Sequence, residues 1–262
     1  MAGDIILTAV NQGIARLTLN RPEVKNAFNE PLIVDLDAAV RRYGADDAVR
    51  VIVLAGAGDA FSAGADLDMM RRAGAASDND NEAGAGGLAK MLTAIYDCPK
   101  PVIALVNGLA MGGGVGLVAA CDIAIAAEEA FFALSEARLG LIPAVISPYV
   151  IRAIGERQAR RYFLTAERFD AETARRIGLV HMVALRVQLE ATLDGALKNL
   201  SACGPMAQKE AKDLIRSVAG APLDDALIAD TAGRIARLRA SPEGREGVAA
   251  FLEKRKPAWM KG

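Results

Sequence analysis

The sequence is poor in the residue types that most often mark metal and nucleophilic sites. Its 262 residues include one histidine, three cysteines and one tryptophan. No cysteine and histidine spacing fits zinc, and the chain has neither the serine-hydrolase motif Gly-x-Ser-x-Gly nor the phosphate-binding motif Gly-x-x-x-x-Gly-Lys-Ser/Thr. We therefore expect no metal and no separate cofactor, and carboxylates become the default acid–base groups.

Charge and hydropathy also limit the partners. Basic and acidic residues number 31 and 32, which gives a formal net charge of −1, and aromatic residues make up 5%. Such a chain has no basic surface or stacking platform for nucleic acid. No apolar run approaches the roughly 20 residues that a membrane span needs. We expect neither a nucleic-acid nor a membrane partner.

The thiols and the first residues indicate the compartment. Cys98, Cys121 and Cys203 are widely spaced and belong to no motif, which is typical of reduced thiols. Residues 1–6 lack a positively charged region followed by a long apolar stretch, so we expect no signal peptide. These features predict a cytoplasmic protein.

Two loops rich in glycine and alanine are the most informative feature that is present. One, at 61–67, follows the apolar run 51–55, and the other, at 111–117, follows 102–108. A loop with few side chains lets a ligand approach the backbone, and its free N–H groups at a helix start attract negative charge. Two such loops facing each other would form an oxyanion hole. The alternative is close strand–helix packing without a ligand.

The order of patterns along the chain predicts an α/β part followed by helices. Two β-strands at 5–10 and 14–19 flank a hairpin turn. Residues 71–87 show no helical period, and we interpret them as a surface segment that is either a lid or an insertion without function. From about residue 186 the apolar spacing is helical throughout. We place the boundary so that 1–195 form the core and 196–262 a C-terminal helical region.

One glutamate is the best acid–base candidate. His181 lies in an apolar run, where a lone histidine is usually structural. Glu136 is an isolated carboxylate that follows a predicted strand, so its side chain either reaches water or is desolvated. Desolvation would raise its pKa towards neutrality, which suits proton transfer. Arg138 could pair with it and cancel that shift.

Several segments together resemble the enoyl-CoA hydratase/isomerase (crotonase) superfamily. The resemblance implies a spiral of repeated ββα turns, a coenzyme A thioester as substrate, and C-terminal helices that build trimers or dimers of trimers. It runs in order from about residue 5 to 257. The segments are 19–29, 61–67, 107–114, 121–124, 134–140, 160–174 and 251–257.

The resemblance also implies roles for individual residues. The N–H groups of Ala65 and Gly113 would hold the thioester oxygen, and Glu136 would be the catalytic acid–base. A neighbouring subunit would bring its C-terminal segment to the coenzyme. The residues implied to contact the substrate or its coenzyme A part are Lys25, Ala27, Ala63, Asp66, Leu67, Gly112, Gly116 and Arg138, with Phe251 and Lys254 from the C-terminal segment.

Gly116 departs from the family's hydratase pattern. It stands where the two-glutamate hydratases have their second glutamate, so a direct copy of their mechanism is excluded. Together with 134–136 and 140–149, this glycine resembles the bacterial methylglutaconyl-CoA hydratases of leucine and acyclic-terpene breakdown. That predicts hydration of a branched 2-enoyl-CoA by a single glutamate.

Two questions remain open at this level. A branched substrate with a distal carboxylate needs a cation, for which Arg71, Arg72 and Arg138 are candidates. An enoyl-CoA isomerase, which shifts a double bond with one carboxylate and no bound water, is the alternative function.

Overall fold

The computed structural model of the chain describes residues 4–260. These residues divide into two compact units, one made of 4–98 and 102–194, the other of 99–101 and 195–260. Each unit is described by itself. Within the described residues no helix is both long and apolar enough to cross a membrane.

The first unit begins with the predicted hairpin. Strands β1 (Ile6–Asn11) and β2 (Ile14–Leu19) pair antiparallel. The two turn residues, Gln12 and Gly13, have φ of 47° and 77°, which is the left-handed pair that a tight hairpin turn requires. The hairpin prediction is confirmed.

A six-stranded sheet forms the centre of this unit. Its order is β1-β2-β3-β5-β7-β10, with every pairing after β1–β2 parallel. Strand β3 (Val51–Gly56), up to Ala55, and strand β5 (Val102–Val106) consist of Val, Ile, Leu and Ala, and these side chains are buried. Parallel strands covered on both faces have this composition. The other two strands are β7 (Ile123–Ala127) and β10 (Met182–Ala184).

A smaller sheet repeats the same order. Strands β4 (Ala60–Ser62), β6 (Leu109–Met111) and β8 (Phe131–Ala133) pair parallel, and β9 (Arg168–Asp170) joins antiparallel. Strands β3, β5 and β7 of the larger sheet are thus each followed by a short strand of the second sheet and then by a helix. This repeated ββα order confirms the predicted fold class.

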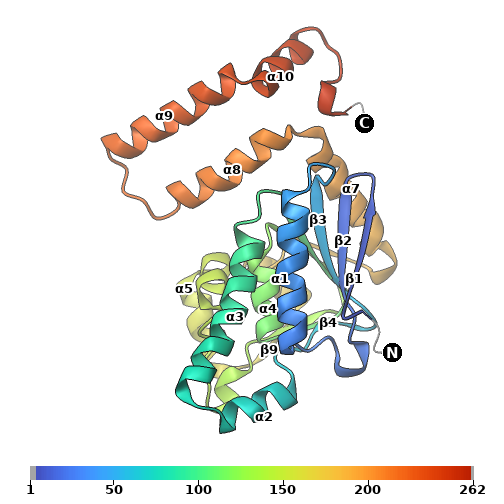
Figure 1. Cartoon of the computed structure of the whole chain (residues 1–262), viewed down its shortest axis with the longest axis vertical. Coiled ribbons are helices and arrows are strands. Elements are labelled where there is room, and N and C mark those ends of the chain that lie inside the picture. Colours follow the sequence, from blue (N-terminus) through green and yellow to red (C-terminus); the bar gives the residue numbers. More distant parts are fainter. Residues whose placement is uncertain (1–3, 261–262) are drawn as a thin grey trace. The chain divides into compact units, whose positions relative to one another are not determined.

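Helices α2, α4 and α6 follow the short strands β4, β6 and β9, whereas α1 follows β2 and α3 follows α2. Figure 1 shows α1 and α3 side by side next to the larger sheet. The loops into α2 and α4 are the two glycine- and alanine-rich loops of the sequence. The bounds are α1 Glu30–Ala45, α2 Leu67–Ala75, α3 Asp78–Tyr96, α4 Gly113–Ala120, α5 Ser147–Thr165 and α6 Ala171–Arg176.

The prediction that residues 71–87 lack regular structure is wrong. They belong to α2 and to α3, which begins at Asp78. Ser77 caps α3 by accepting the N–H of Asp80, and Asn81 donates to the carbonyl of Ala73. The buried end of α3, with Leu92 and Ile95, provides the tertiary packing on which helices depend more than on propensity.

The second unit is helical. Helix α7 (Leu189–Ala202) enters it, followed by α8 (Pro205–Val218), α9 (Asp225–Ala240) and α10 (Pro242–Leu252). The carboxylate of Glu243 accepts the N–H groups of Met206 and Ala207 at the start of α8. Many of its apolar side chains are exposed in this single chain.

Candidate functional site

The two glycine- and alanine-rich loops touch at Gly64. A Cβ built on Gly64 would stand 2.7 Å from the carbonyl oxygen of Met111 and 3.3 Å from the amide nitrogen of Gly113. Its φ of 85° also favours glycine. The close approach brings the start of α4 against the loop that leads into α2.

Two backbone N–H groups at this contact have no acceptor among residues 4–260. Phe28 forms backbone hydrogen bonds with the two residues that flank Ala65. Its N–H donates to the carbonyl of Gly64, and its carbonyl accepts the N–H of Asp66. The N–H of Ala65 has no acceptor among the described residues, and neither has that of Gly113, the first residue of α4. Both residues line one cavity of about 470 Å³. This arrangement can hold an oxygen that gains negative charge.

Glu136 lines the same cavity. It begins a short 3-10 helix, Glu136–Leu139, after β8. Its Oε2 atom is buried and has no hydrogen-bond partner within the described part of the chain. Burial raises the pKa of this carboxyl above its ordinary value of 4.5. Of the two environments that the sequence allowed, the structure shows the desolvated one.

The predicted partner of Glu136 does not cancel that shift. Arg138 is exposed, does not line the cavity and forms no ion pair with Glu136. The walls around the carboxyl are aliphatic, supplied by Leu141, Ile142 and Val145 of the segment before α5. These walls explain why burial dominates the pKa of Glu136.

Two glycines leave space for neighbouring side chains. Gly112, just before α4, lies next to Glu136, and Gly116, in α4, lies next to Ile146. A Cβ on Gly112 would stand 3.0 Å from Oε1 of Glu136, so this glycine gives the carboxyl its space. A Cβ on Gly116 would overlap Cγ2 of Ile146. Ile146 lines the cavity and is 3% exposed. An aliphatic side chain therefore fills the place where a second carboxylate would begin.

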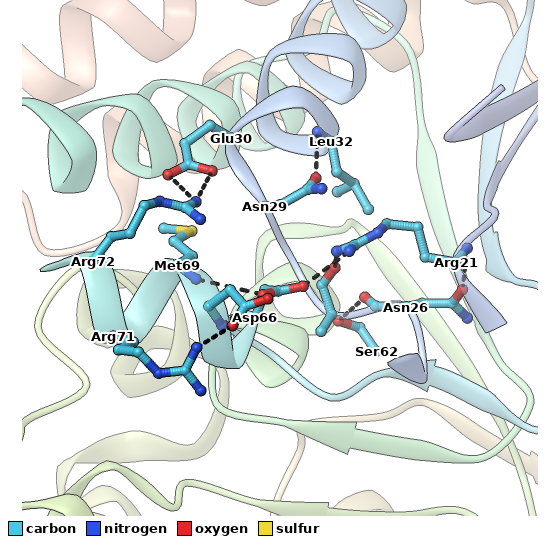
Figure 2. A network of polar contacts seen from close by, with 12 residues as sticks. Arg21, Asn26, Asn29, Glu30, Leu32, Ser62, Asp66, Met69, Arg71 and Arg72 are labelled. Atoms are coloured by element: carbon cyan, nitrogen blue, oxygen red, sulfur yellow. Dashed lines mark hydrogen bonds and ion pairs between the residues drawn. The ribbon is translucent and has the colours of Figure 1, made fainter. Parts of the chain in front are cut away.

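A buried polar network supports the loop of Ala65 (Figure 2). The side chain of Asn26 donates to the carbonyls of Ala57 and Ala60, at 2.9 and 2.8 Å, and accepts the N–H of Arg21. Ser62 donates its hydroxyl to the carbonyl of Asn26 and accepts the N–H of Gly64 at 3.2 Å. The network thus joins segment 19–29 to the loop of Ala65. The sequence did not predict these roles, although segment 19–29 was one of those that carry the family resemblance.

Asp66 is a structural anchor beside Ala65. It caps α2 by accepting the N–H groups of Asp68 and Met69, and it forms a 2.9 Å ion pair with Arg21. Burial acts to raise the pKa of Asp66, but the bonds from the Asp68 N–H and the Arg21 guanidinium outweigh it, so the pKa lies below its usual range. Because the side chain is committed to these bonds and does not line the cavity, any contact with a substrate stays a prediction.

The other predicted residues fall into three groups. Ala63 and Leu67 line the cavity with Ala65. Lys25 is exposed and Ala27 is buried, and neither lines the cavity. Phe251 and Lys254 belong to the second unit and are exposed there. The substrate contacts proposed for these residues stay predictions.

The cavity can hold a developing oxyanion and move a proton. His181 takes no part, since its Nδ1 accepts the N–H of Ala124. The described residues contain no group of histidine, cysteine, aspartate and glutamate side chains suited to a metal ion. Within the cavity, two N–H groups and one carboxyl are suited to these two tasks.

Comparison with known proteins gives matches along nearly the whole chain. A family model described as Enoyl-CoA hydratase/isomerase matches residues 9–262. An enoyl-CoA hydratase structure from Shewanella pealeana shares 41% identity at a TM-score of 0.95, over 98% of this chain and 96% of that one. AtuE of Pseudomonas aeruginosa shares 39% at a TM-score of 0.95, over 98% and 100%. A crotonyl-CoA hydratase of Syntrophomonas wolfei is 33% identical, over 98% of each chain.

Proposed function

This chain belongs to the enoyl-CoA hydratase/isomerase family, and from that premise we propose that it adds water reversibly to a 2-enoyl-CoA. The observation that carries the proposal is the desolvated carboxyl of Glu136 in one cavity with Ala65 and Gly113, whose N–H groups have no acceptor in the described part of the chain. The names of the relatives support hydration.

The two N–H groups activate the substrate. They would donate to the thioester carbonyl oxygen, which gains negative charge as the β-carbon is attacked. Each preorganised donor of this kind contributes about 3–4 kcal/mol to the stability of the transition state. The buried network of Arg21, Asn26 and Ser62 fixes the loop of Ala65 before the substrate arrives.

Glu136 moves the proton in both halves of the reaction. As a carboxylate it takes a proton from water while the water oxygen bonds to the β-carbon, and the π electrons of the double bond shift into the enolate. The protonated Glu136 then gives a proton to the α-carbon and returns to its starting form. One water is added, and a raised pKa suits a group that must both accept and donate.

Placing the water requires a second polar group, because Ile146 excludes a carboxylate near position 116. Besides Glu136, Ser135 is the one residue with a polar side chain among the described residues that line the cavity. We propose that the Ser135 hydroxyl holds the attacking water with Glu136.

The acyl group that we propose is branched, of the 3-methylglutaconyl type. Of the three candidate arginines, Arg72 lines a second cavity next to that of Glu136, whereas Arg71 pairs with Asp68. The guanidinium of Arg72 bonds both oxygens of Glu30 (Figure 2). This pair is exposed and therefore weak, so Arg72 can exchange Glu30 for a distal carboxylate.

The experiment is product analysis with crotonyl-CoA and 3-methylglutaconyl-CoA by mass spectrometry and NMR. We expect a 3-hydroxyacyl-CoA, formed faster from the second substrate. The Glu136→Gln variant should lose activity by about 100-fold or more, while the exposed control Glu128→Gln keeps it. A Glu136→Gln variant that retains more than about a tenth of the rate would contradict the assignment.

The alternative function is an enoyl-CoA isomerase, which the apolar wall at Ile146 favours because isomerisation needs no water. Double-bond migration in a 3-enoyl-CoA, without hydration of either 2-enoyl substrate, would establish it.

A trimer or a dimer of trimers is a further part of the proposal, supported by the exposed apolar side chains of the second unit. Light scattering on the full chain tests it.

A further inference from the structure

The side chain of Asn107 bonds the loop that follows β5 to the loop that follows β3. Its amide nitrogen donates to the carbonyl of Gly56 at 3.1 Å and to the carbonyl of Gly58 at 2.8 Å. Gly56 ends β3, and Gly58 lies between β3 and β4. Asn107 itself lies between β5 and β6. One side chain therefore connects the entries of the two short strands β4 and β6.

Arg186 makes a second bridge between the same two loops. Its Nη1 donates to the carbonyl of Asn107 at 3.1 Å, and its Nη2 donates to the carbonyl of Gly58 at 3.4 Å. The guanidinium also forms ion pairs with Asp59 and Glu129. Both carboxylates are exposed, so these ion pairs contribute little. The two bonds to backbone carbonyls are the ones that join the loops.

The bridged loops lead to the two N–H groups of the candidate site. Strand β4 is followed by Ala65, and strand β6 is followed by Gly113. The two strands form two residue pairs with a register shift between them. So short and irregular a pairing specifies its own register weakly. Contacts at the strand entries must therefore help to hold one strand against the other.

We propose that Asn107 and Arg186 position the N–H groups of Ala65 and Gly113 by holding β4 and β6 in one register. A single oxygen can accept both N–H groups only where each donor lies about 2.7–3.1 Å from it, so sliding of one strand along the other would separate the donors. Neither Asn107 nor Arg186 lines the cavity of Glu136. Both are positioning residues that act through the loops.

Asn107→Asp tests the first bridge with almost no change of shape. The carboxylate has no N–H group to donate, and it faces the two carbonyls that the amide bonded. We expect kcat for hydration to fall by about 10- to 100-fold, because a displacement of about 1 Å can cost that much, while KM changes little. A general loss of folded protein would lower the amount of active enzyme without this pattern.

Gln208→Glu is the matched control for that variant. Gln208 is also a half-buried amide that donates to a backbone carbonyl, that of Leu200 at 2.8 Å. It belongs to the second unit and does not line the cavity of Glu136. The same chemical change at this position should leave kcat unchanged.

Arg186→Lys separates the bridge from the charge. Lysine keeps the positive charge near Asp59 and Glu129 but lacks the planar fork that reaches two carbonyls at once. We expect Arg186→Lys and Arg186→Ala to lose kcat to the same extent. Arg16→Ala is the control, because Arg16 is 38% exposed against 43% for Arg186, forms an ion pair with Glu190 and does not line the cavity. It should keep kcat.

The carbonyl stretch of bound butyryl-CoA reports on the two donors without any reaction. This saturated thioester cannot add water, and isotope-edited infrared spectroscopy can follow its labelled carbonyl at saturating protein. Two N–H donors polarise the carbonyl, so its frequency should fall on binding to the unmodified chain. In Asn107→Asp and Arg186→Ala the frequency should lie nearer to that of the free thioester, whereas both control variants should match the unmodified chain.

The outcomes separate this inference from the proposed function, on which it rests because it takes the thioester carbonyl as the acceptor. An unchanged carbonyl frequency in Asn107→Asp and Arg186→Ala overturns the inference. A change confined to these variants supports it even where no 2-enoyl-CoA is hydrated, a result that would overturn only the proposed function. Hydration with full kcat in both variants would overturn only the inference, and full kcat in Arg186→Lys alone would overturn the bridging role of Arg186.

Discussion

A side chain at position 116 would overlap Cγ2 of Ile146, so these two residues together limit the cavity to one carboxylate. Gly116 is buried in α4, and Ile146 directly precedes α5. The distinction between one and two carboxylates is therefore built into the packing of α4 against the start of α5. Replacing the glycine alone does not restore a second carboxylate.

The first prediction tests that packing. Gly116→Glu should lower the free energy of unfolding by at least about 1–3 kcal/mol, since it overpacks a buried contact and buries a charge. In the double variant Gly116→Glu/Ile146→Ala the space is open, and part of the stability should return. Urea denaturation of both variants measures this. A single variant as stable as the unmodified protein would show that Ile146 moves aside freely.

The second prediction concerns stability and pH. The pKa of Glu136 is raised in the folded protein, so its contribution to stability is fully present below the pKa of the unfolded chain. That contribution is lost as pH rises through the folded pKa. Above it the protein carries a buried charge whose Oε2 lacks a partner among the described residues.

Glu136→Gln removes the ionisation but keeps the shape. We expect the variant to melt at a higher temperature than the unmodified protein at neutral pH, with a difference that shrinks as pH falls towards 4.5, the ordinary value for a glutamate. Thermal unfolding across this pH range measures it, and Glu128→Gln at an exposed site should show no such trend. A difference that grows towards acid pH would mean that Glu136 is stabilised as a carboxylate.

The elements that the sequence predicted well are those set by neighbours along the chain. The hairpin follows from two residues, Gln12 and Gly13, that adopt positive φ. The parallel strands follow from their continuous apolar runs. The start of helix α3 was not predicted, because residues 78–87 are rich in Asp, Asn, Gly and Ala. The buried side chains that hold this helix in place, among them Leu92 and Ile95, lie nearer its C-terminal end.

The site was predictable in its parts but not in its environment. The glycines of both loops and Glu136 stand out in the sequence. The burial of Glu136 depends on how residues 141–146 fold over it, and no local pattern specifies that. The contacts of Asn26 reach Ala57 and Ala60, 31 and 34 residues away, and such distant pairings leave no periodic trace in a single sequence.

The third prediction concerns the anchor beside Ala65. Asp66→Ala removes a helix cap and leaves Arg21, whose side chain is 17% exposed, without its partner. Loss of one member of a buried pair costs about 3–5 kcal/mol. We expect a loss near that size by chemical denaturation, together with a lower kcat because the N–H of Ala65 shifts.

Asp170→Ala is the control for that variant. Asp170 caps α6 by accepting the N–H of Thr173, and it lines neither cavity near Glu136. Its removal should cost only about 1 kcal/mol, the typical value of a cap, and leave kcat unchanged. Equal losses in the two variants would show that the pair with Arg21 adds nothing.

The fourth prediction uses the space that Gly112 leaves for Glu136. In Gly112→Ala the new Cβ would stand 3.0 Å from Oε1 of Glu136, at a backbone φ of 48°. The carboxyl must then move away from the N–H groups with which it acts, and a displacement of this kind can lower the rate by about 100-fold. Gly220→Ala is the control, because its φ of 81° is also positive while its Cβ meets no described atom within 4 Å. Both variants should therefore lose stability, and only Gly112→Ala should lose kcat. Equal kcat values for the two variants would mean that the position of the Glu136 carboxyl does not depend on Gly112.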